Sequence, residues 1–529
     1  MKKAKITIIA ALMAGMFGMT SCDDFLTKTP PTQLTTEGFW SSELNAKSWL
    51  AGTYHELQDA LNENIFMWGE ARADNFYATS YNGSGVVLNA VKSSDGCSNW
   101  KNIYRVIGSC NAGIENVDKV NFASEETARS YKGQWYGLRA MMYFYAIRIW
   151  GDVPLITSVW DGDVNTKYND RTPVADVKKQ IEEDLKMAIS LLDNEGVYYF
   201  NKGAALALKA DVAMWFKDYQ GCVDTVDELM ASGRYKLCAD PTTLKAGWVD
   251  PTKADGEAIF SLYWDYEANG QNPFGQNLGL YSKQPHYGMS NSCLQNMLND
   301  KHDVRFWAVV DTASLYTSSS NNKIELAKGV TRIDYKSGLL ALLTKYLEIS
   351  GVDGTAVKFK TVMNDFDGKI PLLRTADALL LKAEALNKLD RPQEALDIVN
   401  QVRQRAGNSR VALLEDYPVK EGYPYTYVED PTTPGAYIET MSRERLILDE
   451  RQVEFYGEGK RWFDLRRTGY VKDAMDEHLM IAQEFNGEDI VGFELGTTTG
   501  EGRLLFPLHN SVFSSNPNMI GKQNPPYSE

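Results

Sequence analysis

Three glutamates recur at helical spacing in a strongly charged stretch near the C-terminal end. Glu450, Glu454 and Glu458 would lie on one face of a helix. Glycoside hydrolases also use paired carboxylates, but they place the two groups on opposite sides of the scissile bond. The same stretch contains arginines at distances that allow ion pairing along a helix, namely Arg443, Arg445, Arg451, Arg461, Arg466 and Arg467. We therefore interpret the carboxylates as ion-pair partners and predict no catalytic residue.

Two other segments combine flat aromatic rings with amide and charged side chains, a chemistry that suits a neutral sugar. Rings can stack on the apolar C–H faces of a sugar, and Asn, Gln, Asp or Arg can bond its rim of hydroxyls. One segment is residues 263–287 and the other is residues 72–81. The candidate ligand-binding residues are Trp264, Tyr266, Asn269, Asn272, Phe274, Tyr281, Tyr287, Arg72, Asp74, Asn75, Tyr77 and Tyr81.

The aromatic residues of the chain divide into expected ligand contacts and expected core. In the two segments we expect Trp264, Tyr266, Tyr77 and Tyr81 to be exposed. Phe76 and Tyr263 are expected to face inward. Four tryptophans fall on helical apolar stripes and are assigned to the core: Trp100, Trp135, Trp150 and Trp462.

No motif supports a metal or a cofactor. The five histidines never fall at helical ligand spacing, and H-E-x-x-H is absent from the sequence. Asp161-Gly-Asp163-Val-Asn165 is similar to the start of an EF-hand loop. However, Thr166 and Thr172 stand where that loop needs Gly and Glu. We predict no cofactor, and a structural calcium of another type stays open.

The cysteines beyond residue 22 do not form a recognisable framework. They are odd in number and contain no C-x-x-C, which argues against both a disulfide scaffold and a zinc site. A bridge between Cys97 and Cys110 is one alternative, and buried free thiols are favoured. The five are Cys97, Cys110, Cys222, Cys238 and Cys293.

The N-terminal residues have the pattern of an export signal. Lys2, Lys3 and Lys5 precede an uncharged apolar run of 14 residues, 6–19, which is too short to span a bilayer. The run ends in Met19-Thr20-Ser21-Cys22, which resembles the lipobox of bacterial lipoproteins. In that class the cysteine is acylated and becomes the mature N-terminus. We predict a signal peptide over residues 1–21 and a lipid on Cys22, with an ordinary signal peptide as the alternative.

Composition limits the classes of partner. The 529 residues carry a net charge of −15, and removal of the lysine-containing signal would make the charge more negative. Such a surface repels nucleic acid and anionic membranes, which bind basic patches. Twelve Trp, 28 Tyr and 20 Phe supply many rings for a neutral ligand. We therefore predict no nucleic-acid partner.

Helical periodicity dominates the chain. Apolar residues at spacings of three and four predict helices around residues 100–110 and 131–150. Thr172-Pro173 predicts a helix start, with Thr172 as the N-cap. Two alanine-rich helix–turn–helix pairs are predicted at residues 204–230 and 376–406, and they resemble tetratricopeptide units. Residues 241–360 show few helical periods and are predicted to form a long irregular insertion.

Ordered motifs along almost the whole chain resemble the SusD/RagB family of outer-membrane nutrient-binding lipoproteins. The most specific is Arg443-Glu444-Arg445 followed by Glu450-Arg451, Glu454-Phe455 and Glu458-Gly459-Lys460-Arg461-Trp462-Phe463-Asp464-Leu465-Arg466-Arg467. Further matches are Cys22-Asp23-Asp24-Phe25-Leu26, Trp150-Gly151-Asp152-Val153-Pro154, Arg171-Thr172-Pro173, Lys202-Gly203-Ala204-Ala205, Arg374-Thr375-Ala376-Asp377 and Gln523-Asn524-Pro525.

The resemblance implies a mainly α fold in which tetratricopeptide-like helix pairs form a SusD-like scaffold for a loop-rich, sugar-binding face. It implies a single domain over residues 22–529, with the insertion at about 241–360 contributing to the ligand site. It further implies that the family's sugar contacts fall broadly in the two aromatic segments.

The resemblance also implies a partner and a location. The partner is a SusC-like TonB-dependent transporter barrel, over which the lipoprotein acts as a lid. The location is the outer membrane, through the lipid anchor, facing the cell exterior.

We therefore expect a cell-surface glycan-binding lipoprotein that captures an oligosaccharide and delivers it to the transporter, without covalent chemistry. Two alternatives stay open. One is a binder of peptide or another nutrient within the same uptake architecture, and the other is a surface glycoside hydrolase.

Overall fold

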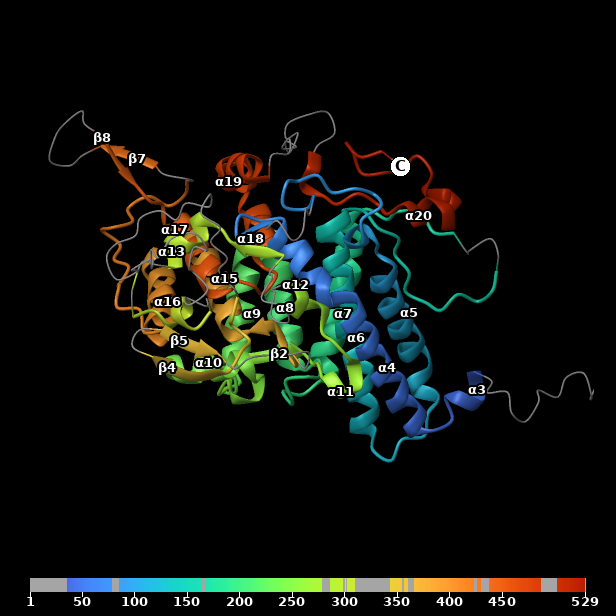
Figure 1. Ribbon diagram of the computed structural model, residues 1–529. Helices are drawn as coiled ribbons and strands as arrows, with labels where there is room; N and C mark the ends of the chain where they lie inside the picture. Colours follow the sequence, from blue (N-terminus) through green and yellow to red (C-terminus); the bar gives the residue numbers. More distant parts are fainter. Residues whose placement is uncertain are drawn as a thin grey trace, which may run out of the picture.

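The protein is mostly helical (Figure 1). The computed structural model describes residues 36–78, 85–163, 168–277, 286–297, 300, 302–309, 343–353, 356–359, 366–422, 426–429, 437–486 and 502–528. The predicted signal peptide, the domain boundary at Cys22, and candidates Tyr81 and Tyr281 lie outside these residues.

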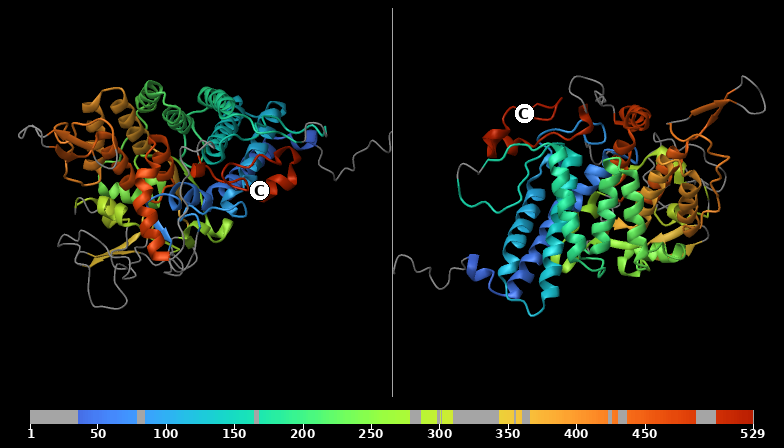
Figure 2. Two further views of the ribbon diagram at one scale, coloured as in Figure 1. Left: turned by 90° about the horizontal axis from the view of Figure 1, so that it is seen from above. Right: turned by 180° about the vertical axis from the view of Figure 1, so that it is seen from behind.

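Four helix pairs form the scaffold, as the resemblance to tetratricopeptide units implied. Each pair packs together, and neighbouring pairs also touch, so that the pairs follow one another in a row (Figure 2). The pairs are α4 (Glu43–Phe66) with α5 (Lys101–Asn116), α6 (Glu125–Trp150) with α7 (Val174–Leu191), α8 (Lys202–Trp215) with α9 (Tyr219–Ala231), and α15 (Thr375–Lys388) with α16 (Pro392–Arg405).

Short polar side chains begin several of these helices. Ser42 accepts a hydrogen bond from an amide of the first turn of α4, and Asn201 does the same for α8. The predicted cap of α7 is wrong. Its first residue, Val174, instead donates its N–H to Oδ1 of Asp152 at 2.9 Å, so the cap comes from the turn after α6. A distant carboxylate thus fixes where α7 starts.

The segment predicted to be irregular contains several short elements. Strand β2 pairs antiparallel with β6 and thereby joins the early part of the insertion to the chain that follows it, while β1 pairs antiparallel with β3. The elements of this segment are α10 (Pro241–Val249), β2 (Ala258–Leu262), α11 (Tyr266–Asn269), α12 (Pro273–Asn277), β3 (Tyr287–Met289), α13 (Asn291–Met297), α14 (Val304–Trp307), β4 (Ile349–Asp353) and β5 (Ala356–Phe359). Their partner strands β1 (Phe76–Ala78) and β6 (Ile370–Arg374) lie outside it.

One cluster of buried apolar side chains extends from the first helix pair to the C-terminal segment. It includes the four tryptophans assigned to the core, which are all buried. Helices α5 and α6 approach so closely that a Cβ on Gly113 would lie 2.3 Å from the ring of Trp135. The five cysteines beyond Cys22 are buried and free, so the alternative bridge between Cys97 and Cys110 is not formed.

The charged C-terminal motif forms two helices separated by a turn. Helix α17 ends at Glu454, and Glu458 lies in the turn before α18. The remaining elements are α3 (Thr36–Phe39), β7 (Thr426–Glu429), β8 (Tyr437–Thr440), α17 (Arg443–Glu454), α18 (Arg461–Thr468), α19 (Val471–Asn486) and α20 (Asn510–Ser515). None of the described helices has an apolar stretch long enough to cross a bilayer.

Ion pairing of the three glutamates is confirmed, but the predicted partners are wrong. Glu450, Glu454 and Glu458 bind basic residues from elsewhere in the sequence rather than the arginines of their own segment. Their partners are Arg305, Arg374, Arg403, Arg405 and Lys345. We call these eight residues the buried charge cluster. It joins α17 and the following turn to α14, β6, α16 and the segment before β4.

Glu454 is the centre of the buried charge cluster and is 0% exposed. Its Oε1 accepts hydrogen bonds from Arg405 at 2.8 Å and Arg374 at 3.0 Å, and its Oε2 accepts one from Arg305 at 3.1 Å. Burial alone would raise the pKa of this carboxyl. The three guanidinium groups outweigh burial and hold the pKa well below its usual value.

Replacing the central carboxylate should destabilise the fold strongly. In Glu454→Gln, three buried guanidinium groups would face a neutral amide, so we expect a loss of about 3–5 kcal/mol in the free energy of unfolding, measured by denaturant titration. The control is Asp476→Asn, which removes an exposed i,i+4 pair with Lys472 and should change stability by less than about 0.5 kcal/mol. Equal effects of the two substitutions would contradict the central role of Glu454.

Stability should fall steeply in acid. The folded-state pKa of Glu454 is depressed, and the same holds for Asp377, where Lys460 and Arg451 outweigh burial. The unfolded state therefore takes up these protons first, and the stabilisation is lost as the pH falls below about 4.3. Burial raises the pKa of Glu70 to about 7, which acts in the opposite direction but only above about pH 4.3. Urea titrations between pH 3 and 4.5 should show this slope, and a pH-independent free energy of unfolding there would contradict it.

Candidate ligand-binding site

A short turn from the insertion is fastened to helix α4 and carries several of the predicted ligand residues. Gln58 on α4 donates its amide to the carbonyl of Tyr263 at 2.6 Å and accepts a hydrogen bond from Asn269 at 3.1 Å. Within the turn, Asp265 caps α11, and the indole of Trp264 donates to the carbonyl of Gly270 at 3.0 Å. One glutamine therefore holds residues 263–270 against the scaffold.

Beside this turn lies a hollow of about 790 Å³, a size typical of small-molecule sites. We call it the acidic hollow. Its walls come from three regions: the C-terminal half of α4 with Met67, residues 85–102, and residues 264–273 with Tyr287. Strand pairing between β1 and β3 brings Tyr287 to the first of these regions, where its hydroxyl lies 3.5 Å from the sulfur of Met67.

Carboxylates and amides dominate the polar groups of the acidic hollow. Asp59, Glu63 and Asp95 line it, and no described lining residue is a lysine or an arginine. Arg105 lies outside the lining, 3.6 Å from Asp59, and partly offsets that charge. The amides of the lining are Asn62, Asn64, Asn102, Asn269 and Gln271. The hollow therefore presents many hydrogen-bonding groups in a negative field, which disfavours anionic ligands.

The described part of the early aromatic segment, residues 72–78, is buried in the interior, so these side chains present little surface to a ligand. Arg72 is sandwiched between the rings of Trp462 and Phe506, and Asp74 accepts two hydrogen bonds from Arg461 at 2.7 and 2.8 Å. These groups join the N-terminal half of the chain to α18 and the C-terminal segment.

The neighbours of Arg72 and Asp74 are also internal. Asn75 is buried and donates to Glu70, and Tyr77 is 3% exposed and stacks on His478 with ring centroids 4.5 Å apart. The expected exposure of Tyr77 is therefore wrong, while the inward orientation of Phe76 is confirmed.

The candidates in residues 263–287 differ in how exposed they are. Trp264 is only 7% exposed, contrary to expectation, but it lines the acidic hollow together with Asn269 and Tyr287. Tyr266 is 37% exposed, as expected, and Tyr263 is 42% exposed rather than buried. The remaining candidates, Asn272 and Phe274, are buried, Asn272 donating its side-chain amide to the carbonyl of Gly368.

The residues that the sequence analysis missed lie mainly on α4. Asp59, Asn62 and Glu63 recur at i, i+3 and i+4 and so share a face of that helix. The spacing of these acids and amides along the helix was the available signal in the sequence. Gln271 also lines the hollow and lies inside the predicted segment, but it was not among the predicted ligand-binding residues.

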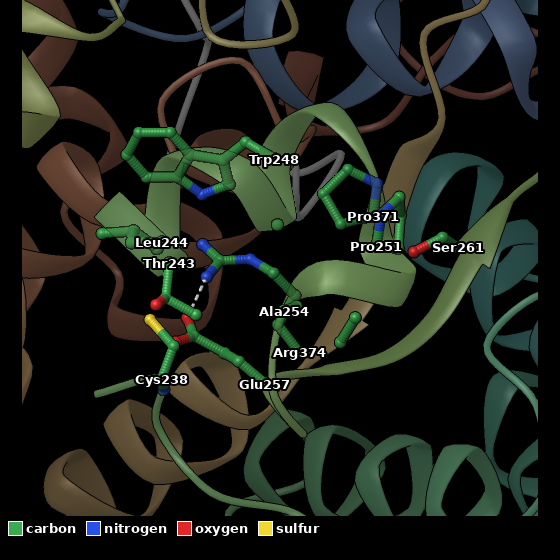
Figure 3. A pocket seen from close by; sticks show the side chains of 12 residues that line it. Cys238, Thr243, Leu244, Trp248, Pro251, Ala254, Glu257, Ser261, Pro371 and Arg374 are labelled. Carbon is green, nitrogen blue, oxygen red and sulfur yellow. Dashed lines mark hydrogen bonds and ion pairs between the residues drawn. The ribbon is translucent and has the colours of Figure 1, made fainter. Parts of the chain in front are cut away.

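A second, much smaller cavity adjoins the buried charge cluster (Figure 3). Arg374 and Glu257 face one another there at 2.7 Å, with Trp248 and Cys238 nearby. Its volume of about 10 Å³ is at the lower limit for one water molecule. It cannot hold a sugar unit. Separately, the described residues contain no group of three or more His, Cys, Asp or Glu arranged to hold a metal ion.

Comparison with known proteins gives the family. Residues 344–527 match the model of the SusD family, and residues 24–214 match a model described as starch-binding associating with outer membrane. The chain is 27% identical to SusD-like protein P38 of Formosa agariphila, and the alignment covers both chains completely.

Solved structures share the fold. NanU of Bacteroides fragilis superposes with a TM-score of 0.68 at 22% identity, covering 95% of this chain and 100% of that one. A SusD superfamily protein of Bacteroides thetaiotaomicron gives a TM-score of 0.69 at 21% identity, covering 92% and 100%.

The helix-pair scaffold with its ligand-sized hollow is that of a substrate-binding protein associated with the outer membrane. The chain belongs to the SusD/RagB family. At the level of the family, these proteins bind substrates and are not enzymes.

Loss of the Gln58 side chain should loosen the turn that borders the acidic hollow. In Gln58→Ala, the carbonyl of Tyr263 and the amide of Asn269 lose their partner, so we expect a loss of about 1–3 kcal/mol in the free energy of unfolding. Hydrogen exchange should also become faster in residues 263–270.

The matched control is Gln220→Ala, which removes an exposed i,i+4 hydrogen bond to Asp224. It should leave both readouts close to wild type. If exchange in residues 263–270 is unchanged in Gln58→Ala, the anchoring role of Gln58 is wrong.

Proposed function

We propose that this chain binds a neutral oligosaccharide in the acidic hollow and delivers it to a TonB-dependent outer-membrane transporter of the SusC type. The observation that carries this proposal is the composition of the hollow, in which three carboxylates and five amides lie around Trp264 and Tyr287. Carboxylates and amides are the side chains that bond sugar hydroxyls in both directions, as acceptors and as donors. Membership of the SusD/RagB family supports the same class of ligand.

The charge of the hollow narrows the ligand class. Sugars that carry sulfate or carboxylate groups would bring negative charge next to Asp59, Glu63 and Asp95. At a separation of about 4 Å in water, each such pair of like charges costs about 1 kcal/mol. We therefore propose a neutral rather than an acidic glycan.

Binding without hydrolysis is part of the proposal. The glutamates that might suggest a glycosidase are buried in the charge cluster, and Glu450 and Glu454 each bind more than one arginine. A carboxylate held in this way has no free side for a glycosidic bond and no raised pKa for a general acid.

The anchor and the partner complete the proposal. The lipobox-like sequence ending at Cys22 supports attachment to the outer membrane by a lipid, with the folded part facing the cell exterior. Purification from detergent-solubilised native outer membranes should yield the chain together with a TonB-dependent barrel. Recovery of the chain alone under mild detergent would contradict the proposed delivery step.

A direct binding experiment tests the ligand class. The purified protein should retain neutral oligosaccharides on a glycan array, should not cleave them, and should not retain peptide pools. Calorimetry with the best ligand should then give the affinity. Retention of peptides alone would favour the nutrient-binding alternative, and release of shorter sugars would favour a hydrolase.

The selectivity should depend on the exposed acids of α4. In Asp59→Asn/Glu63→Gln, which removes charge without changing shape, sulfated or uronate-containing oligosaccharides should bind several-fold more tightly. A control pair on an exposed surface, Asp224→Asn/Glu228→Gln on α9, should change nothing. Equal binding of acidic glycans by the wild type and the α4 variant would overturn the electrostatic basis of the selectivity.

A further inference from the structure

Another large hollow, distinct from the small cavity beside the buried charge cluster, lies on the other side of the turn that Gln58 fastens to α4. Its volume is about 630 Å³, again within the range of small-molecule sites. It is bordered by the N-terminal half of α4, by α6, by residues 198–199 and by the end of β2 with the following turn. We call it the tyrosine hollow, because five tyrosines line it: Tyr54, Tyr131, Tyr198, Tyr199 and Tyr263.

Four of these tyrosines form two edge-to-face pairs. Tyr199 stands on Tyr54 with ring centroids 5.4 Å apart and an interplanar angle of 85°. Tyr263 stands on Tyr198 with centroids 5.1 Å apart and an angle of 74°. Tyr54 and Tyr198 are half-buried and support the outer rings. Of these outer rings, Tyr199 is 58% exposed and Tyr263 is 42% exposed. The exposed rings are thus held in defined positions before any ligand arrives.

The supporting rings are anchored within the scaffold. The hydroxyl of Tyr54 donates to Gln134 on α6 at 2.7 Å and accepts the N–H of Phe200 at 2.8 Å. Burial, with Asp250 and Tyr263 nearby, raises the pKa of Tyr198 to about 12, so its hydroxyl keeps its proton. Lys369 lies 5.6 Å from the ring centroid of Tyr263, so a ligand would use the remaining exposed surface of that ring.

The charge of the tyrosine hollow is small. Lys47 is the one lysine among the described lining residues, which include no arginine, aspartate or glutamate. Flat rings with protonated hydroxyls and little charge match a neutral pyranose, which has an apolar face and a polar rim. A peptide would bring terminal or side-chain charges for which this hollow offers no carboxylate partner.

The two hollows meet at one residue. Asn269 lines both of them, and its amide is held by Gln58, which also lines the tyrosine hollow. A chain-like ligand in the acidic hollow can therefore continue past Asn269 without leaving the protein surface. Both hollows then contact successive parts of one molecule.

We propose that the tyrosine hollow is a second carbohydrate subsite, which takes one end of the same neutral oligosaccharide that occupies the acidic hollow. This proposal rests on the proposed function. The affinity then increases with ligand length, because only oligosaccharides long enough to cross Asn269 contact Tyr199 and Tyr263.

The test compares ligands of increasing length on the full mature chain. Calorimetry with a series from disaccharide to octasaccharide should show that wild-type affinity rises with length. In Tyr199→Ala/Tyr263→Ala that rise should be lost, with about a tenfold weaker binding of the longest ligand than in wild type. Tyr199→Phe should retain most of the effect, because it keeps the ring.

The control is Tyr168→Ala, which removes an exposed tyrosine outside both hollows and should follow the wild type at every length. Thermal unfolding verifies that each variant is folded. An unchanged length dependence in the double variant, or an equal loss for short and long ligands, overturns the second subsite.

Two further outcomes separate this proposal from others. If the wild type binds no glycan of any length, the proposed function itself fails. If the double variant instead changes the oligomeric state in sedimentation, the tyrosine hollow is a contact between copies of this chain, and the second subsite is again wrong.

Discussion

The buried ion pairs around Glu454 determine which parts of the chain meet. Arg305, Arg374 and Arg405 come from three different elements and converge on one carboxylate that has no contact with solvent. A carboxylate in such a position loses several kcal/mol of hydration, so it is tolerated only when its charge is fully paired. Hydrophobic packing alone would not select these partners, because it has no direction. Ion pairs are directional, so they select which elements pack against α17.

The proposed ligand-binding face depends on this arrangement through the insertion. Arg374 ends β6, which pairs with β2, and β2 leads directly into the turn at residues 263–270. At the other side, Arg461 holds Asp74 immediately before β1, and β1 pairs with β3, which carries Tyr287. The walls of the acidic hollow are therefore positioned from both sides by buried charges that do not line it. The stability of the fold and the shape of the hollow are linked in this way without sharing residues.

The sequence predicted the scaffold better than the site. Helical periodicity and the alanine-rich pairs predicted α8, α9, α15 and α16, because a buried helix face leaves a local pattern of spacing. The partners of Glu450, Glu454 and Glu458 could not be predicted in this way. Arg305 and Glu450 are 145 residues apart, and spacing carries no information over such distances.

The same limitation explains the errors among the ligand residues. Arg72, Asp74 and Asn75 have the composition of a sugar-binding loop, and they are polar because they join buried parts of the fold. Composition cannot distinguish a polar group that bonds a ligand from one that bonds another side chain. Tyr263 and Trp264 directly follow β2 and have opposite exposure. Successive side chains of an extended backbone point to opposite sides, so an error of one residue exchanges the two assignments.

The attachment of residues 263–270 by Gln58 has a consequence for how this fold can diversify. Two hydrogen bonds between the turn and α4 run through the one amide side chain of Gln58, while the helix itself is fixed by its own packing in the core. The other residues of the turn can be exchanged without disturbing α4, provided that the hydrogen bonds to Gln58 are kept. Preference for a new nutrient can therefore evolve by replacing a few loop residues while the framework stays constant.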